Sequence, residues 1–205
     1  MLFISRKLIK YKIDFCNRIM VMIKIQIFNY IIKYNIFLNK MIYAKCVIKK
    51  NGIRGYVEFE EIENNFFIRV IVNLSGLPPG AHGISICKSG ECHDTDVHYN
   101  PTNKRHGGPK DVNRHIGDLG NITADKNGNV KTEFVDNKIK LSGKYSIIGR
   151  SVVIYEKEDD MGKGGINEKG HIINMKKYMQ SIKTGNSGRK LACGIIGYRK
   201  DSKEL

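Results

Sequence analysis

Several common signatures are missing from the sequence, and each absence narrows the class of protein. None of the five cysteines forms a CxxC pair, which argues against a cysteine-based zinc finger. No helix-turn-helix motif, RNA-binding motif or internal repeat is evident. No small-residue cleavage site follows the apolar segment near the N-terminus, so we expect no secretory signal peptide.

Acidic residues are scarce relative to basic ones. The chain has 20 Asp and Glu against 35 Lys and Arg, which gives a formal net charge of +15. Such a charge would suit nucleic acid or an anionic surface. The chain is also rich in Ile, Lys, Asn and Tyr, whose codons are rich in A and T, so we attribute the charge to coding bias. We expect no specific nucleic-acid binding; a basic virion protein that binds nucleic acid is the alternative.

No apolar run is long enough to cross a membrane without interruption. The most apolar segment, residues 19–38, contains two lysines, two asparagines and a glutamine, which makes it a poor transmembrane span. Residues 1–40 carry eight Lys or Arg and a single acid, Asp14. We interpret them as a basic extension that is disordered or not translated, with Met41 as the true start. A basic helix on a membrane surface is the alternative.

From residue 41 onward, short runs of β-branched and aromatic residues alternate with turn residues. Asn51-Gly52 is a strong hairpin signal between two such runs. Segments 88–127 and 157–190 show almost no strand pattern, and no segment shows a convincing helix. The pattern predicts an antiparallel β-sandwich over residues 41–205 with two long loops. The expected strands cover residues 45–49, 55–60, 65–74, 83–87, 129–135, 146–156 and 192–198.

The first long loop carries three histidines and an aspartate in the spacing H-x7-H-x8-H-x2-D, namely His98, His106, His115 and Asp118. Three imidazoles and a carboxylate are sufficient for a tetrahedral zinc site. The loop has little apolar surface of its own, so a metal that fixes four points of it would offset much of its ordering entropy. The alternative is a set of exposed, unrelated loop histidines.

Longer runs around these residues resemble the copper/zinc superoxide dismutase family, in the family's order and close to its spacing. The resemblance covers about residues 44–199. It implies an eight-stranded Greek-key β-barrel, usually a homodimer, with a zinc loop and an electrostatic loop over a copper site. The matching runs are HYNP at 98–101, KRHGGPKD at 104–111, RHIGDLGNITADKNG at 114–128, LSG at 141–143, SIIGR at 146–150, EKEDDMGKGG at 156–165, TGN at 184–186 and LACGIIG at 191–197.

The resemblance implies that the structural parts of the family are retained. His98, His106, His115 and Asp118 match the zinc ligands one for one. Five further positions match structural residues of the family. They are Asp159, which in the family connects the residues that support the ligands of the two metals; His82, which ties a loop to the barrel; Cys92 and Cys193, which form the intrasubunit disulfide; and Cys46, a buried strand cysteine.

The same resemblance implies that the copper site is lost. In the family, copper lies between four histidines, and three of these positions hold Ser85, Cys87 and Tyr155 here, so that only the shared ligand His98 remains. Serine is a poor copper ligand, a tyrosine favours the oxidised ion, and a cysteine thiolate favours Cu(I) and is easily oxidised. Lys190 replaces the arginine that guides the anion; it keeps the charge but loses the planar fork. We therefore expect zinc without copper, and no dismutation.

The loops also depart from the family pattern. The segment between residues 87 and 98 is shorter than in the family, and the second loop has an insertion at about residues 166–183. We interpret this insertion as a solvated surface segment.

Because the zinc ligands and disulfide cysteines are retained while three of the four copper ligands are lost, we expect a zinc-stabilised, non-catalytic protein that acts by binding, similar to degenerate relatives in poxviruses. Expected partners are the host copper chaperone for superoxide dismutase or the host dismutase itself, with the protein in the host cytoplasm or the virion. One alternative is an active dismutase with an altered copper site made of Cys87, His98 and Tyr155. The dismutase-like domain of a copper chaperone is disfavoured, because residues 1–40 contain no MxCxxC motif.

Overall fold

The computed structural model describes residues 18–30, 41–62, 66–93 and 97–199, and divides the chain into two compact units, 1–40 and 41–205. In the first unit, residues 18–30 are helical; the rest of the proposed extension lies outside the described residues. No helix among the described residues is both long and apolar enough to span a membrane.

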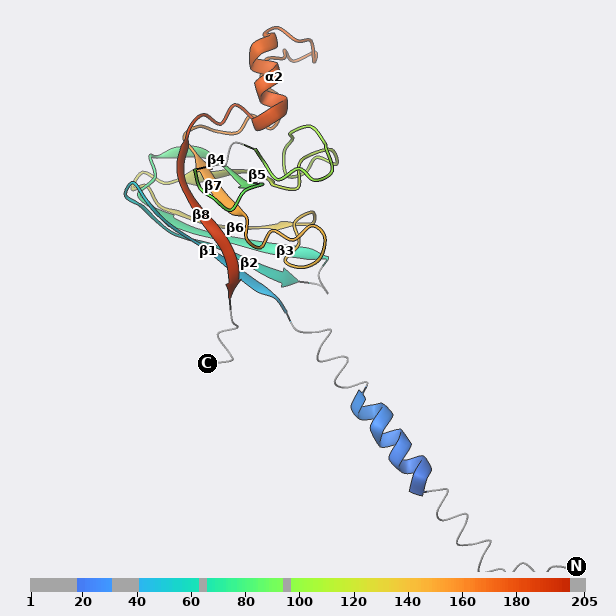
Figure 1. The fold of residues 1–205 in the computed structure, drawn as a ribbon. Helices are drawn as coiled ribbons and strands as arrows, with labels where there is room; N and C mark the ends of the chain where they lie inside the picture. Colours follow the sequence, from blue (N-terminus) through green and yellow to red (C-terminus); the bar gives the residue numbers. More distant parts are fainter. Residues whose placement is uncertain (1–17, 31–40, 63–65, 94–96, 200–205) are drawn as a thin grey trace, which may run out of the picture. The chain divides into compact units, whose positions relative to one another are not determined.

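The second unit is an antiparallel β-barrel of eight strands in the order β5-β4-β7-β8-β1-β2-β3-β6 (Figure 1). This arrangement confirms the predicted eight-stranded Greek-key β-barrel. One helix, α2, is inserted between β7 and β8. The elements are β1 Tyr43–Lys50, β2 Ile53–Ile62, β3 Phe67–Ser75, β4 Gly80–Cys87, β5 Asp118–Ala124, β6 Val130–Asp136, β7 Ser151–Tyr155, α2 Met175–Thr184 and β8 Lys190–Arg199.

Alternating polarity explains why these segments are strands with one face in the core. In β3, Arg69 is exposed between the buried Ile68 and Val70, and Asn73 is exposed between the buried Val72 and Leu74. The hairpin signal between β1 and β2 is also confirmed: Asn51 and Gly52 have φ angles of 54° and 83°, and the left-handed region suits these two residues.

Two expectations about secondary structure were wrong. The segment 88–127 is not all loop, because β5 pairs with β4 and buries Leu119 and Ile122. The strand expected at 146–156 begins only at Ser151, because residues 146–150 form a turn. Short strands rich in Gly, Asn and Thr have a weak periodic signal, and pairing with a neighbouring strand decides their conformation.

The helix α2 is a third correction, because no helix was expected in the second long loop. Both of its caps are visible in the sequence. Asn174 accepts a hydrogen bond from the backbone N–H of Lys177 at 3.0 Å, and Gly185 ends the helix with φ 69°. These two residues are the signal that could have located the helix, since its apolar pattern alone is short.

The cysteines are distributed as the resemblance implied. Cys46 is fully buried in the core, and burial raises the pKa of its thiol to about 12, so it behaves as a small apolar side chain. Cys92 and Cys193 form a disulfide with a sequence separation of 101 residues. The disulfide joins the segment after β4 to β8, so it fixes the first long loop to the barrel.

We expect the double variant C92A/C193A to lose about 4–5 kcal/mol of unfolding free energy, because the crosslink restricts the unfolded chain over a long loop. Chemical unfolding of zinc-saturated protein measures the loss. Adding a reductant should destabilise the wild type by a similar amount and leave the variant unchanged. An equal response of both proteins to the reductant would contradict this role.

Candidate metal centre

Four buried side chains from the loop before β5, and from the first residue of β5 itself, converge on one point. The Nδ1 atoms of His98, His106 and His115 lie 2.8, 2.9 and 3.0 Å from Oδ1 of Asp118. The four ligand atoms all lie within 4.8 Å of one another, and each side chain is almost completely buried. The structure thus brings together all four residues that the spacing had singled out.

Two of these imidazoles have, on the side facing Asp118, a buried nitrogen that no protein group satisfies. Nδ1 of His106 and Nδ1 of His115 lie close to the Asp118 carboxylate, yet neither has a hydrogen-bond partner. A buried polar atom without a partner is costly, so this arrangement is unfavourable unless a cation lies among the four ligands. Three imidazoles and one carboxylate are a donor set suited to tetrahedral zinc.

Hydrogen bonds from behind hold the ligands in place. The second oxygen of Asp118, Oδ2, accepts from the backbone N–H groups of Gly107 at 3.1 Å and His115 at 2.8 Å. Nε2 of His106 lies 2.7 Å from Oδ1 of Asp159, which also accepts from the N–H of Met161 at 2.7 Å. A carboxylate on the far nitrogen orients a ligating histidine and fixes its tautomer.

Asn121 belongs to this support, although the sequence did not point to it. Its amide donates to the carbonyl of Asp159 at 2.9 Å and accepts from the Asp159 N–H at 2.7 Å. This pair of hydrogen bonds fixes the backbone of Asp159 to β5. Nothing in the sequence alone places residues 121 and 159 next to each other.

His82 lies in β4 and is buried between two backbone carbonyls. Its Nδ1 is 2.8 Å from the carbonyl oxygen of Tyr155, and its Nε2 is 2.7 Å from that of Pro78. The side chain therefore connects the turn before β4 to the end of β7. This placement agrees with the tying role that the resemblance implied.

Without a metal, the carboxylates shift the titration of their partners. Burial alone would lower the pKa of His106, but the neighbouring carboxylates of Asp118 and Asp159 outweigh burial and raise it to about 9. Burial alone would raise the pKa of Asp118, but the three histidines hold it well below its usual range. The metal-free site at neutral pH therefore holds a proton on His106 that a metal must displace.

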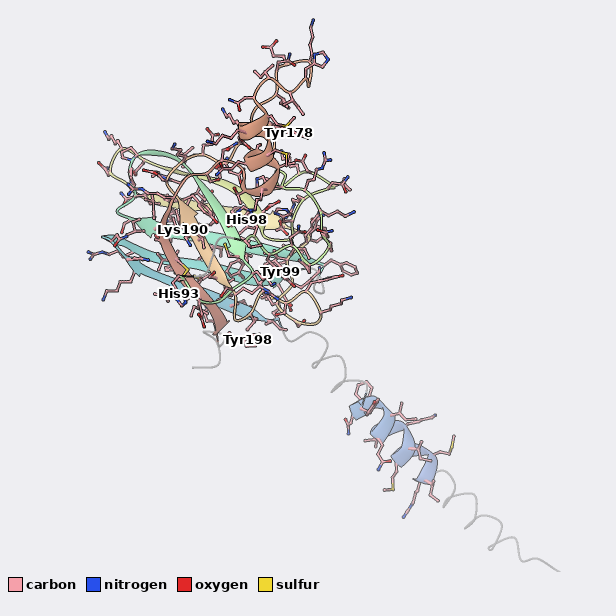
Figure 2. All side chains as sticks on the ribbon, turned by 45° about the horizontal axis from the view of Figure 1, so that its top comes forward. His93, His98, Tyr99, Tyr178, Lys190 and Tyr198 are labelled. Carbon is pink, nitrogen blue, oxygen red and sulfur yellow. A yellow bond between two sulfur atoms is a disulfide. The ribbon has the colours of Figure 1, made fainter. Side chains whose placement is uncertain are left out.

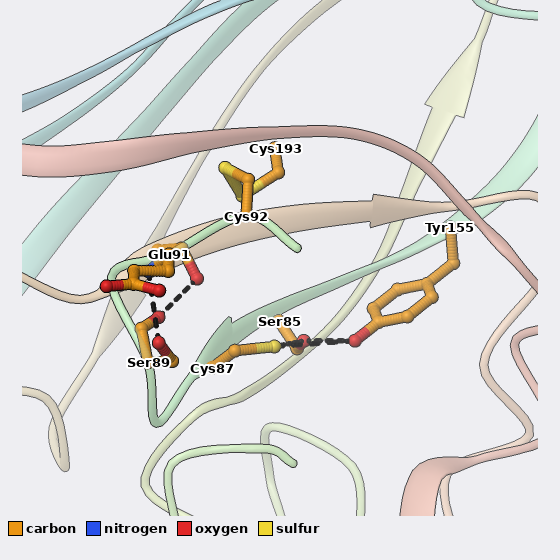
Figure 3. The surroundings of a disulfide bond; sticks show 8 residues. Ser85, Cys87, Ser89, Glu91, Cys92, Tyr155 and Cys193 are labelled. Atoms are coloured by element: carbon orange, nitrogen blue, oxygen red, sulfur yellow. Dashed lines mark hydrogen bonds between the residues drawn. A yellow bond between two sulfur atoms is a disulfide. The ribbon is translucent and has the colours of Figure 1, made fainter. Parts of the chain in front are cut away.

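Ser85, Cys87 and Tyr155, which the resemblance places at three copper-ligand positions of the family, form a buried cluster of their own (Figure 3). Oγ of Ser85 lies 3.1 Å from the Tyr155 hydroxyl and 3.6 Å from Sγ of Cys87, and Sγ of Cys87 lies 3.5 Å from the same hydroxyl. Burial, followed by the nearby Cys87, raises the pKa of Tyr155 well above its usual value, so the phenol stays neutral. The cluster satisfies its own polar atoms without an ion.

His98 stands between the two clusters. Its Nδ1 faces Asp118, while its buried Nε2 has no hydrogen-bond partner, and its ring centroid lies 6.0 Å from that of Tyr155. Around the second cluster, the protein offers one imidazole, one thiol and two hydroxyls. This donor set differs from the four imidazoles of the family's copper site.

The anion-guiding position, Lys190, is the first residue of β8, and its backbone pairs with that of Tyr155. Both residues line a surface hollow of about 720 Å³, and residues of α2 line it as well. Figure 2 labels Lys190 on the barrel and Tyr178 on α2. The neighbouring Arg189 forms an ion pair with Glu156 at 3.1 Å. The hollow is basic, because its lining contains Lys176, Lys183, Arg189 and Lys190.

Comparisons with known proteins agree with the fold and with the first cluster. The family model "Copper/zinc superoxide dismutase (SODC)" matches residues 53–196. Superoxide dismutase [Cu-Zn] A of Xenopus laevis is 43% identical over 163 residues, which cover 77% of this chain and 99% of that protein. Superoxide dismutase [Cu-Zn] of Paramecium bursaria Chlorella virus 1 is 38% identical over 164 residues, covering 78% of this chain and 80% of that protein.

A solved structure also resembles the chain. The crystal structure of the clock protein EA4 has a TM-score of 0.67 and 40% sequence identity, and the match covers 77% of this chain and 94% of that chain. The chain therefore resembles this structure over most of its length.

Proposed function

The chain belongs to the copper/zinc superoxide dismutase family, and we propose that it is a zinc-stabilised member that does not catalyse dismutation and acts by binding another protein. The observation that carries this proposal is the contrast between two neighbouring clusters. One keeps three imidazoles and a carboxylate with unsatisfied nitrogens. The other has closed into a hydrogen-bonded group of Ser85, Cys87 and Tyr155.

Zinc supports the fold and supplies no electron transfer. When bound, it would be held by His98, His106, His115 and Asp118, and it has no accessible redox chemistry. Dismutation requires an ion that cycles between two oxidation states, and imidazoles suit both states of copper. The neutral, buried phenol of Tyr155 is a weak donor for such an ion. These properties support zinc as the resident metal and the absence of a bound copper.

We propose a binding role because the chain keeps the groups that stabilise the fold but, in this proposal, lacks the ligands for a redox metal. The disulfide, the cluster of three histidines and Asp118 (the zinc-type cluster) and the hydrogen bond from His106 to Asp159 are present together. By the resemblance, in contrast, three of the four copper ligands are replaced. We propose as partners the host copper chaperone for superoxide dismutase or the host dismutase, with the protein in the host cytoplasm or the virion. We propose a viral source for the chain, supported by the relative that comes from a virus, and the proposed host partners follow from that source.

The family commonly forms homodimers, and we include self-association in the proposal. The paired strands β1 and β8 expose Val47, Ile195 and Tyr198, with more than half of each side chain accessible. Exposed apolar side chains on two paired strands are consistent with a protein contact surface there. We further propose that residues 1–40 are a basic extension that takes no part in the function of residues 41–205.

An active dismutase with an altered copper site is the second candidate, favoured by one observation. Nε2 of His98 has no hydrogen-bond partner, the His98 ring lies 6.0 Å from that of Tyr155, and Cys87 forms a β-bridge with His98, so the three residues could together hold copper. Copper titration of zinc-loaded protein, followed by a superoxide decay assay, separates the two candidates. We expect no stoichiometric copper and a decay rate equal to that of the buffer control. Tight, stoichiometric copper with rapid superoxide decay would overturn the proposed function.

A further inference from the structure

The helix α2 belongs to the insertion at residues 166–183, and it is held firmly at its base. Ser181 is fully buried; its hydroxyl accepts from the N–H of Gly164 at 2.8 Å and donates to Asp160 at 2.5 Å. The N–H of His106 donates to the carbonyl of Ile182 at 2.9 Å. The end of α2 is therefore attached directly to a residue of the zinc-type cluster, and the insertion is not a loosely solvated loop.

The other face of the insertion leaves large apolar side chains in solvent. Ile173 is 71% exposed, Met175 60% and Met179 55%. Met175 and Met179 are four residues apart and so lie on one side of the helix. An exposed group of apolar side chains on a well-anchored helix is characteristic of a contact surface.

Basic residues surround these apolar side chains. Residues 166–190 contain six Lys or Arg and one acid, Glu168. Lys176 and Lys177 lie in the first turn of α2, which has no acidic residue. Cations at a helix N-terminus oppose the helix dipole, so their placement costs stability rather than adding to it. A negatively charged partner would reverse this cost.

Two hollows flank the helix and share residues of it. The larger, of about 720 Å³, and a second of about 340 Å³ are both lined by Met179, Lys183 and Thr184. Met179 and Lys183 thus form a ridge with a depression on either side. Such a shape can receive side chains of a partner on both sides of the helix.

From these features we infer that the α2 ridge, defined as Ile173, Met175, Lys176, Met179 and Lys183, docks an acidic protein segment that also carries apolar side chains. The inference rests on the proposed binding function and names its surface and its type of partner. Methionines adapt to varied apolar side chains, and the lysines around them select carboxylates. A single nucleic-acid strand would instead call for exposed aromatic platforms, and the Tyr178 hydroxyl on α2 is engaged by Arg105 at 3.4 Å.

The test uses a fluorescent amphipathic peptide of about 16 residues, with leucines on one face and glutamates on the other. Two control peptides replace either all leucines by alanine or all glutamates by glutamine, and an oligothymidine serves as a non-protein polyanion. Fluorescence anisotropy with the full zinc-loaded chain gives the Kd of each. The variants are K176E/K183E and M179D on the ridge. The matched control is K126E/K131E, which makes the same change of net charge at exposed positions away from α2.

We expect K176E/K183E and M179D each to weaken binding of the acidic leucine peptide at least about tenfold, with K126E/K131E unchanged. Both control peptides should bind more weakly than the parent peptide. The inference is overturned if the wild type does not bind the peptide, if K126E/K131E weakens binding equally, or if oligothymidine binds as tightly. These results are independent of copper content and superoxide decay, so a failure here is distinguishable from a failure of the proposed function.

Discussion

The substitution Asp118→Asn is expected to abolish tight zinc binding and to remove the stabilisation that zinc provides. That stabilisation is about 4 kcal/mol when free zinc is about a thousandfold above its Kd. An amide has nearly the shape of the carboxylate but no negative charge, and Asp118 faces three imidazoles with one oxygen. Its other oxygen accepts from two backbone N–H groups. In either orientation of the amide, the NH₂ group of asparagine would therefore face these N–H donors or replace the oxygen that faces the imidazoles.

The matched control is His93→Asn, which changes a histidine that is outside the cluster and exposed. Thermal and chemical unfolding of the wild type and both variants, with zinc and again with a chelator, measures how much zinc stabilises each protein. The wild type and the His93 variant should lose stability in chelator, whereas the Asp118 variant should be indifferent to zinc. If the wild type unfolds at the same denaturant concentration with and without zinc, the metal has no structural role.

Restoring the imidazoles at the second cluster should have the largest effect on activity. We expect the triple variant S85H/C87H/Y155H, loaded with zinc and copper, to bind copper tightly and to accelerate superoxide decay by several orders of magnitude over the wild type. Ser85 and Cys87 lie two residues apart on β4 and share a face with Tyr155 on the neighbouring β7, so three histidines there would converge beside His98. Imidazole ligands suit both oxidation states of copper.

The control variant S85A/C87A/Y155F removes the same polar groups without adding ligands. Copper content after dialysis and the rate of superoxide decay are measured for both variants and the wild type. The control should match the wild type in lacking activity. Should the restored variant hold copper yet remain inactive, the loss of three ligands would not be the reason for inactivity, and the altered loop would have to be considered.

The sequence located the first metal cluster well because its ligands are close along the chain. His98, His106, His115 and Asp118 lie within 21 residues, so a single loop and the start of one strand bring them together. Asp159, which supports His106 from behind the cluster, comes from a second loop. Its hydrogen bonds with Asn121 depend on packing between that loop and β5. Such a contact is fixed by tertiary structure, which periodicity does not record.

For the second cluster, the resemblance indicated which residues stand at three histidine positions of the family, but it did not predict the hydrogen bonds among them. The resemblance identified Ser85, Cys87 and Tyr155 as substitutes for histidines. That their polar atoms would bond one another depends on the pairing of β4 with β7, in which Ser85 lies opposite Val153. The strand alternation gave seven of the eight strands, with one starting too early, and β5 was hidden in a segment rich in glycine and asparagine.

The helix α2 was missed for a different reason. Its apolar residues are mostly exposed, so they do not form the buried stripe by which a surface helix is recognised. Its stability comes from the two caps and from the contacts of Ser181 and Ile182 at its base. The attachment to His106 also gives a reason why a chain proposed to lack catalysis would keep zinc, because the metal would hold the base of the proposed docking ridge.

The most direct test of the central claim is the metal content of the purified chain after expression with both metals and dialysis against a weak chelator. Elemental analysis should find about one zinc per chain, as the four-ligand set requires, and copper far below one equivalent. A full equivalent of copper that survives dialysis beside the zinc would contradict the account.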